Sequence, residues 1–189
     1  MLKAIIWDFD GVIADSEPAH YRAFLEVVEP MGIRFDYETY LERYVGFDDR
    51  DGFDAILKDG GQPAPEGPTR QALCERKAEA FDRIMASHAA ALPGAVELIN
   101  AAHGQLHQAI ASGATRRDID GVLKQLRLRD RFPVILSADD VAHSKPDPAS
   151  YRLAVEKLAK HHDAALGPGE CLAIEDTAAG IASAKGAGL

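Results

Sequence analysis

The stretch Ala4-Ile5-Ile6-Trp7-Asp8-Phe9-Asp10-Gly11 decides how the rest of the chain is interpreted. Its first four residues are apolar and β-prone, which is typical of a buried strand. Two aspartates follow, one residue apart, and the glycine after them permits a sharp turn. In an open α/β sheet, ligands bind beyond the carboxyl ends of the strands. The stretch therefore predicts Asp8 and Asp10 at the mouth of a site, although an ordinary Asp-Gly turn would give the same pattern.

Two carboxylates in this arrangement suit two kinds of chemistry. One can attack a substrate or bind a metal while its neighbour moves a proton. A calcium-binding loop of the helix-loop-helix type does not fit, because it needs an oxygen ligand where Val12 stands and glycine where Ile13 stands. That loop also follows a helix, whereas a strand is expected here.

Bulk composition narrows the classes of protein and partner. Of the 189 residues, 47% are hydrophobic and 27% are charged, which is ordinary for a globular domain with a smaller insert. The formal net charge of −9 makes nucleic acid and anionic membranes unfavourable partners. The two cysteines stand far apart, no apolar stretch reaches membrane-spanning length, and the N-terminus lacks a secretory signal pattern. We therefore expect a cytoplasmic protein without a disulfide framework, a nucleic-acid partner or a membrane partner.

The succession of patterns predicts an α/β core interrupted by a helical insert. Apolar residues at helical spacing dominate residues 15–91, around a Pro- and Gly-rich connection at 59–68. From residue 92 onward, short apolar runs at 108–111, 134–136 and 171–174 alternate with helical patterns. Such alternation indicates a parallel sheet with right-handed crossovers. We predict a core formed by residues 1–14 and 92–189, with an all-helical domain inserted at 15–91.

Polar residues with possible chemical roles follow the later strands of the predicted core. Ser112 and Gly113 precede a helix, where a hydroxyl and free backbone N–H groups suit a phosphate oxygen. Lys145 precedes a proline and can act as a point charge on phosphate. Glu175 and Asp176 offer the carboxylate oxygens that Mg²⁺ prefers. Each group also has a plainer interpretation, as a helix cap or as a surface lysine in a Pro-rich turn.

The order of these groups resembles the haloacid dehalogenase-like hydrolase superfamily. An acid-x-acid pair, a serine, a lysine and a second acid pair follow one another, each at a strand end. The match includes Asp-Phe-Asp-Gly-Val-Ile-Ala-Asp-Ser-Glu at 8–17, Ser-Lys-Pro-Asp-Pro at 144–148 and Glu-Asp-Thr-Ala-Ala-Gly-Ile at 175–181. These motifs are similar to the subfamily of phosphatases and β-phosphoglucomutases, and the resemblance covers nearly the whole chain. It implies a Rossmann-like parallel sheet core with an inserted all-helical cap domain.

The resemblance implies a role for each catalytic position. Asp8 would be the nucleophile that forms an aspartyl-phosphate. Asp10 would be the general acid/base, and its presence argues for phosphate chemistry rather than carbon–halogen cleavage. Ser112 and the N–H of Gly113 would hold the phosphoryl group. Lys145 would neutralise that group and orient Asp8.

The resemblance also implies Mg²⁺ as the cofactor. Asp176 would bind the ion together with the Asp8 carboxylate and the Asp10 carbonyl, and Glu175 would bind it directly or through water. Such an ion relieves the repulsion between a carboxylate nucleophile and an anionic phosphate.

Residues of the helical insert would supply the substrate contacts that a closing cap makes. The candidates are His20, Gly46, Arg50 and Lys77. Each has a plainer interpretation: a packing histidine, a helix stop, or a solvated helix charge. Members of the superfamily usually continue into a further strand after the final Ala-Gly, so the strand at 171–174 is expected to form a sheet edge.

The leading functional hypothesis is a Mg²⁺-dependent phosphatase acting on a small phosphorylated metabolite. The alternative is a sugar-phosphate mutase, which must return phosphate to its substrate instead of losing it to water. A phospho-acceptor signalling domain also uses Asp, a hydroxyl residue, Lys and Mg²⁺, but it carries its acid pair and its acceptor aspartate on different strands. The identity of the substrate and the oligomeric state stay open.

Overall fold

The structure, a computed structural model, describes the 189 residues except 46, 48, 89, 163 and 164. The chain forms two compact units. The first, called the core below, comprises Met1–Asp15 and Ala89–Leu189, and the second, called the cap, comprises Ser16–His88.

A four-stranded parallel sheet with the order β3-β2-β1-β4 organises the core. The strands are β1 (Ala4–Trp7), β2 (His107–Ala111), β3 (Val134–Leu136) and β4 (Cys171–Ile174). Trp7 pairs with Ile110 on one side and with Ile174 on the other. This register brings the carboxyl ends of β1, β2 and β4 level, so the residues that follow them share one edge of the sheet. Within the described sheet β4 is an edge strand, as expected.

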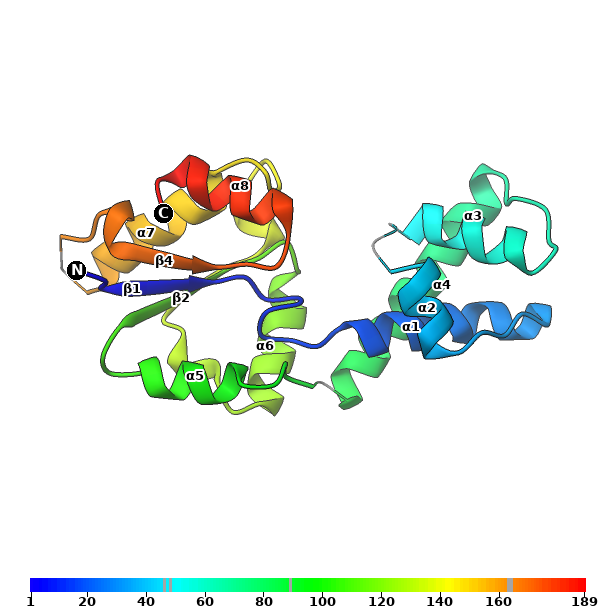
Figure 1. Cartoon of the computed structure of the whole chain (residues 1–189), viewed down its shortest axis with the longest axis horizontal. Helices are drawn as coiled ribbons and strands as arrows, with labels where there is room; N and C mark the ends of the chain where they lie inside the picture. The colour runs from blue at the N-terminus through cyan, green and yellow to red at the C-terminus, as the bar shows by residue number, and fades with distance from the viewer. Residues whose placement is uncertain (46, 48, 89, 163–164) are drawn as a thin grey trace. The chain divides into compact units, whose positions relative to one another are not determined.

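Helices cover both faces of the sheet, with α7 and α8 on one face and α5 and α6 on the other (Figure 1). Their bounds are α5 (Ala95–Ala102), α6 (Arg116–Gln125), α7 (Ala149–His161) and α8 (Ala178–Ala187). Alternate strand residues such as Ile6, Ala109 and Leu136 pack against α7 in one hydrophobic cluster. On the other face, the Trp7 indole donates to the Gln108 amide oxygen at 3.1 Å. The predicted α/β class with a parallel sheet is confirmed.

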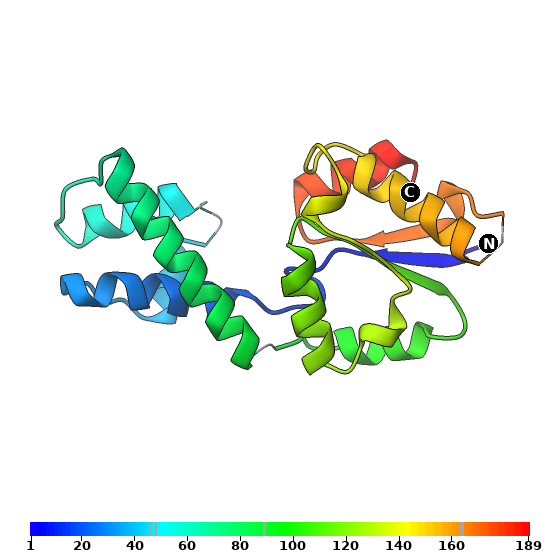
Figure 2. The same ribbon diagram turned by 180° about the vertical axis from the view of Figure 1, so that it is seen from behind.

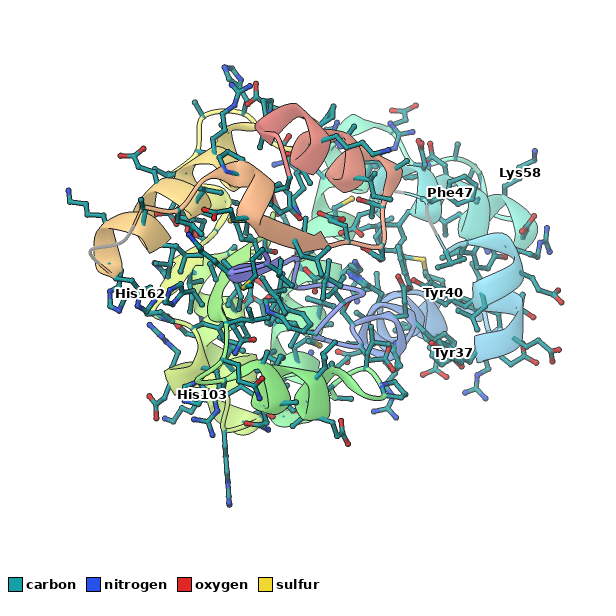
Figure 3. The ribbon with its side chains drawn as sticks, turned by 60° about the vertical axis from the view of Figure 1, so that its left-hand side comes forward. Tyr37, Tyr40, Phe47, Lys58, His103 and His162 are labelled. Atoms are coloured by element: carbon teal, nitrogen blue, oxygen red, sulfur yellow. The ribbon has the colours of Figure 1, made fainter. Side chains whose placement is uncertain are left out.

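The cap is all helical, with its own hydrophobic cluster around Phe24, Phe53 and Ile56. Its helices are α1 (Glu17–Val28), α2 (Tyr37–Arg43), α3 (Asp49–Asp59) and α4 (Gly67–His88). The long helix α4 packs against α1, and Figure 2 shows it from behind as it crosses α1. Tyr37 and Tyr40 project from α2 with nearly parallel rings, 6.0 Å between centroids (Figure 3). The inserted helical domain predicted from the sequence is therefore present.

Short 3₁₀ turns complete the secondary structure, at Glu29–Met31, Arg129–Arg131, Ala138–Asp140 and Pro168–Glu170. Among the described helices, none is both long enough and apolar enough to cross a membrane. Cys74 and Cys171 are free thiols.

The two chain segments that flank the cap meet inside the core. Ala14 and Ala91 form an isolated antiparallel bridge, and the Leu92 N–H donates to the Ile13 carbonyl at 3.0 Å. Backbone hydrogen bonds within the core therefore join the two segments between which the cap is inserted.

Candidate active site

The segment after β1 places Asp8 and Asp10. The Asp8 N–H donates to the carbonyl of Ile174 at 2.9 Å, which extends the β1–β4 pairing by one bond. The chain then turns tightly, because the N–H groups of Ile13 and Ala14 both donate to the carbonyl of Phe9, at 2.8 and 2.9 Å. Both aspartates therefore follow the carboxyl end of β1, as the sequence predicts.

Asp8 is a buried carboxylate beside a lysine. Its side chain is 11% exposed, and Lys145 Nζ donates to Asp8 Oδ1 at 2.7 Å. Burial raises the pKa of Asp8 to about 6, an effect that Lys145 partly opposes and that the charge of Glu175 reinforces. The carboxylate is therefore ionised at neutral pH. Its surroundings are partly desolvated, which favours nucleophilic attack by one of its own oxygens.

Glu175 is saturated with hydrogen bonds. Its Oε1 accepts from Lys145 and, at 2.9 Å, from the Tyr151 hydroxyl. Its Oε2 accepts from the N–H and the hydroxyl of Thr177, at 3.3 and 3.1 Å. Burial tends to raise the pKa of Glu175, but the Lys145 and Tyr151 contacts outweigh it and the pKa lies below its ordinary value. Glu175 is thus a fixed negative charge that shares Lys145 with Asp8.

Two glycines create the space for the acid pair. Gly11 has φ of 72°, and a Cβ there would lie 2.0 Å from Asp176 Oδ2. A Cβ on Gly180 would lie 1.9 Å from the carboxyl carbon of Glu175. Neither position accepts a side chain without displacing a carboxylate.

Three carboxylates converge at this edge of the sheet. Asp8, Glu175 and Asp176 each offer one oxygen, and these oxygens lie within 4.8 Å of one another. An all-oxygen, anionic donor set fits Mg²⁺ rather than a softer metal. Thr177, and not Asp176, caps α8 by accepting from the Gly180 N–H at 3.0 Å. The presence of an acid at position 176 is therefore not explained by helix capping.

Ser112 and Gly113 follow β2 at the same edge. The Ser112 side chain is buried, and its Oγ accepts from the N–H of Ala114 at 3.0 Å. Thr115, and not Ser112, caps α6 by accepting from the N–H of Asp118. The space beside Gly113 is open, with no atom within 4 Å of where a Cβ would stand. An anion can therefore approach the backbone at this position without a steric barrier.

The cap candidates lie within the cap as follows. Lys77, 3% exposed, donates to Asp49 Oδ1 at 2.6 Å and contacts His20 Nδ1 at 2.7 Å. Burial, together with the positive charge of Lys77, lowers the pKa of His20 to about 4, so its ring is neutral at pH 7. Arg50 lines a cavity of about 290 Å³ on α3 and α4. Gly46 lies outside the described residues.

Four of the remaining histidines lie away from the carboxylates. His103, His107, His161 and His162 line a cavity of about 420 Å³ near the start of β2, the opposite edge of the sheet (Figure 3 labels His103 and His162). The rings of His107 and His162 stack, with centroids 3.7 Å apart. Among the described residues, the group that could hold a metal ion is formed by Asp8, Glu175 and Asp176 and includes none of these histidines, which agrees with a packing role.

The structure adds three residues that sequence reasoning missed. Tyr151 contacts Glu175, Asp49 neutralises Lys77, and Gly180 makes room for the Glu175 carboxyl. Gly180 stands inside the motif at 175–181, so its position was a usable signal. Tyr151 and Asp49 gave none, because their partners lie 24 and 28 residues away along the chain.

Comparison with known proteins agrees with this geometry. A sequence model of the haloacid dehalogenase-like hydrolases matches residues 2–188. Protein CbbY of Rhodobacter capsulatus is 34% identical over 197 residues, which cover 100% of this chain and 83% of that protein. The fructose-1-phosphate phosphatase YqaB of Escherichia coli (strain K12) is 28% identical over 185 residues, covering 98% and 92% of the two chains.

A solved structure shows the same likeness. The crystal structure of CbbY from Rhodobacter sphaeroides in complex with xylulose-(1,5)-bisphosphate matches with a TM-score of 0.72 and 30% identity, covering 100% of this chain and 84% of that one. The shared fold, the order of the strand-end residues and the family match lead to one assignment. The chain belongs to the haloacid dehalogenase-like hydrolase family.

Proposed function

We propose that this protein is a Mg²⁺-dependent phosphatase that hydrolyses a small phosphorylated metabolite through an aspartyl-phosphate on Asp8. The observation that carries the proposal is the 2.7 Å contact between Lys145 and Asp8, at the edge where three carboxylates converge. Relatives named as phosphatases support a phosphoric monoester hydrolase. A fructose-1-phosphate phosphatase and a xylulose bisphosphate complex among the matches favour a sugar phosphate as substrate.

Each residue at the edge of the sheet has a task in this reaction. An Asp8 carboxylate oxygen attacks phosphorus, and the bond from phosphorus to the leaving oxygen breaks. Asp10 gives that oxygen a proton and then takes one from the water that hydrolyses the aspartyl-phosphate. Lys145 balances the phosphoryl charge, while Ser112 and the N–H of Gly113 hold its oxygens.

Mg²⁺, when bound by Asp8, Asp176 and the Asp10 carbonyl, supplies positive charge that lowers the repulsion between the nucleophile and the phosphate. Glu175 holds Lys145 beside Asp8, and its carboxylate would be a further ligand for the ion, directly or through water.

Specificity is assigned to the cap. We propose that His20, Arg50, Lys77 and Gly46 act on the part of the substrate that leaves with the oxygen. Because Asp49 already neutralises Lys77, this part of the cap carries less positive charge than the lysine alone would give. The two free thiols agree with a reducing cytoplasm, which we propose as the location.

The test is release of inorganic phosphate from a panel of phosphorylated sugars and other small metabolites, with and without Mg²⁺. We expect steady turnover that Asp8→Asn abolishes and Asp82→Asn preserves. Asp82 serves as the matched control, because it is an exposed aspartate of the cap helix α4. Undiminished phosphate release by a folded Asp8→Asn protein would refute the mechanism.

The same panel separates the alternative functions. A mutase returns the phosphoryl group to its substrate, so it converts one sugar phosphate into its isomer. A phospho-acceptor domain keeps the phosphoryl group on its aspartate and does not release phosphate steadily from a phosphate ester. Sustained release without isomer formation is the result that supports the phosphatase.

A further inference from the structure

Tyr151 is buried beside the carboxylates without being one of the expected site residues. It lies on α7 and is completely inaccessible to solvent. Its hydroxyl donates to Glu175 Oε1 at 2.9 Å, and Lys145 Nζ lies 5.1 Å from the centroid of its ring. One side chain therefore contacts both the carboxylate and the ammonium that adjoin Asp8.

Lys145 depends on such contacts for its position. A lysine ammonium ends a flexible four-carbon stem and has no preferred geometry of its own. Here three groups surround it: the Asp8 carboxylate, the Glu175 carboxylate and the face of the Tyr151 ring. An aromatic face attracts a cation over this distance, and the attraction is stronger in a desolvated site.

Glu175 is confined in turn by its neighbours. Thr177 holds its Oε2, and Gly180 lies so close that an added Cβ would overlap the carboxyl group. The Tyr151 hydroxyl is the remaining neutral donor on Oε1 that the structure shows, beside the charged donor Lys145. Removing that hydroxyl leaves Lys145 as the one donor on Oε1 that the structure shows, so this oxygen and the ammonium can shift together away from Asp8.

We propose that Tyr151 is a positioning residue, whose hydroxyl fixes Glu175 and whose ring face fixes Lys145, so that the ammonium stays on Asp8. The inference rests on the proposed function only for its effect on turnover. The position of the Lys145 ammonium, which the inference explains, can be tested without a substrate.

The experiment compares two hydroxyl deletions of the same kind. Tyr151→Phe keeps the ring and removes the hydroxyl that meets Glu175. Tyr44→Phe removes a hydroxyl that donates to Asp59 Oδ2 at 2.8 Å within the cap, so it is the matched control. Circular dichroism and thermal unfolding establish that both variants are folded.

The first measurement is the rate at which acetic anhydride modifies Lys145, followed by mass spectrometry with the other lysines as internal references. We expect modification about threefold faster in Tyr151→Phe and unchanged in Tyr44→Phe, since only the former loosens the ammonium. The second measurement is phosphate release. We expect kcat to fall about tenfold in Tyr151→Phe with little change in KM, the size of one lost hydrogen bond to a charged group.

Two results would overturn the inference. One is an unchanged Lys145 modification rate in folded Tyr151→Phe. The other is a kcat that stays at the wild-type value or falls equally in both variants. If the wild-type protein releases no phosphate from any substrate, the proposed function fails, and the modification rates still decide whether Tyr151 positions Lys145.

Discussion

Replacing Asp8 with asparagine is expected to stop turnover and, in metal-free protein, to make the fold more stable. The substitution keeps the shape of the side chain and removes its charge. It leaves Lys145 with Glu175 as an anionic partner, so no buried cation loses all of its neutralising charge. The two effects have opposite signs, which separates them from general damage to the protein.

The size of the stabilisation follows from the pKa of Asp8. Burial raises that pKa from 3.8 to about 6, with Lys145 opposing the change only in part. The folded protein therefore holds the Asp8 proton more tightly than the unfolded chain does. The stability that this provides is complete below the unfolded pKa and is lost as the pH rises through about 6. The loss corresponds to about 2 to 3 kcal/mol above neutral pH.

The assay is urea unfolding in EDTA, with wild type, Asp8→Asn and the control Asp82→Asn. At about pH 8 the Asp8→Asn protein should be more stable than wild type by about 2 kcal/mol, and at about pH 4 the difference should nearly vanish. The control should follow wild type at both pH values. An Asp8→Asn protein that is less stable than wild type at the higher pH would show that the surroundings stabilise the Asp8 charge, contrary to this reasoning.

Three further predictions test single contacts. Gly180→Ala should lower kcat about 10- to 100-fold, because the added Cβ displaces the Glu175 carboxyl group. The control is Gly121→Ala, whose Cβ meets no atom within 4 Å; it should leave phosphate release unchanged and raise the free energy of unfolding by about 0.5 to 1 kcal/mol. Equal phosphate release by the two variants would contradict this prediction. Asp49→Asn should lower the free energy of unfolding by about 1 to 2 kcal/mol, because the buried Lys77 loses its carboxylate partner while the partial exposure of Asp49 limits the loss. Urea unfolding measures the change. An unchanged free energy of unfolding would show that the Lys77–Asp49 ion pair does not stabilise the fold. Asp176→Asn should raise the Mg²⁺ concentration for half-maximal phosphate release about tenfold or more, and an unaltered metal requirement would exclude Asp176 as a ligand.

The core of this fold could be predicted because each buried parallel strand is a short apolar run that can be recognised in the local sequence. The runs at 134–136 and 171–174 coincide with β3 and β4, and β2 begins one residue before the predicted run at 108–111. Since the carboxyl ends of parallel strands meet at one edge, the order of polar residues after each run was enough to bring Asp8, Lys145 and Glu175 together. The contacts among these three residues agree with that prediction.

The surroundings of these residues could not be predicted in the same way. A tyrosine in a helical pattern has the same appearance whether it fills a core or donates to a carboxylate, so Tyr151 carried no separate signal. The sequence left Lys77 open between a substrate contact and a solvated helix charge. In the structure it is buried between Asp49, His20 and two aromatic rings. Such pairings depend on how helices pack against one another, which the periodicity of a single helix does not contain.

The bridge between Ala14 and Ala91 has a consequence for how this architecture can change over time. For the core, everything between those two residues is one long loop whose ends are already tied together. The entropy of closing a loop grows only with the logarithm of its length, by about 0.6 kcal/mol per doubling. Exchange of the whole insert by recombination at this point therefore costs the core little, and a lineage can acquire new substrates while the chemistry at the strand ends stays as it was.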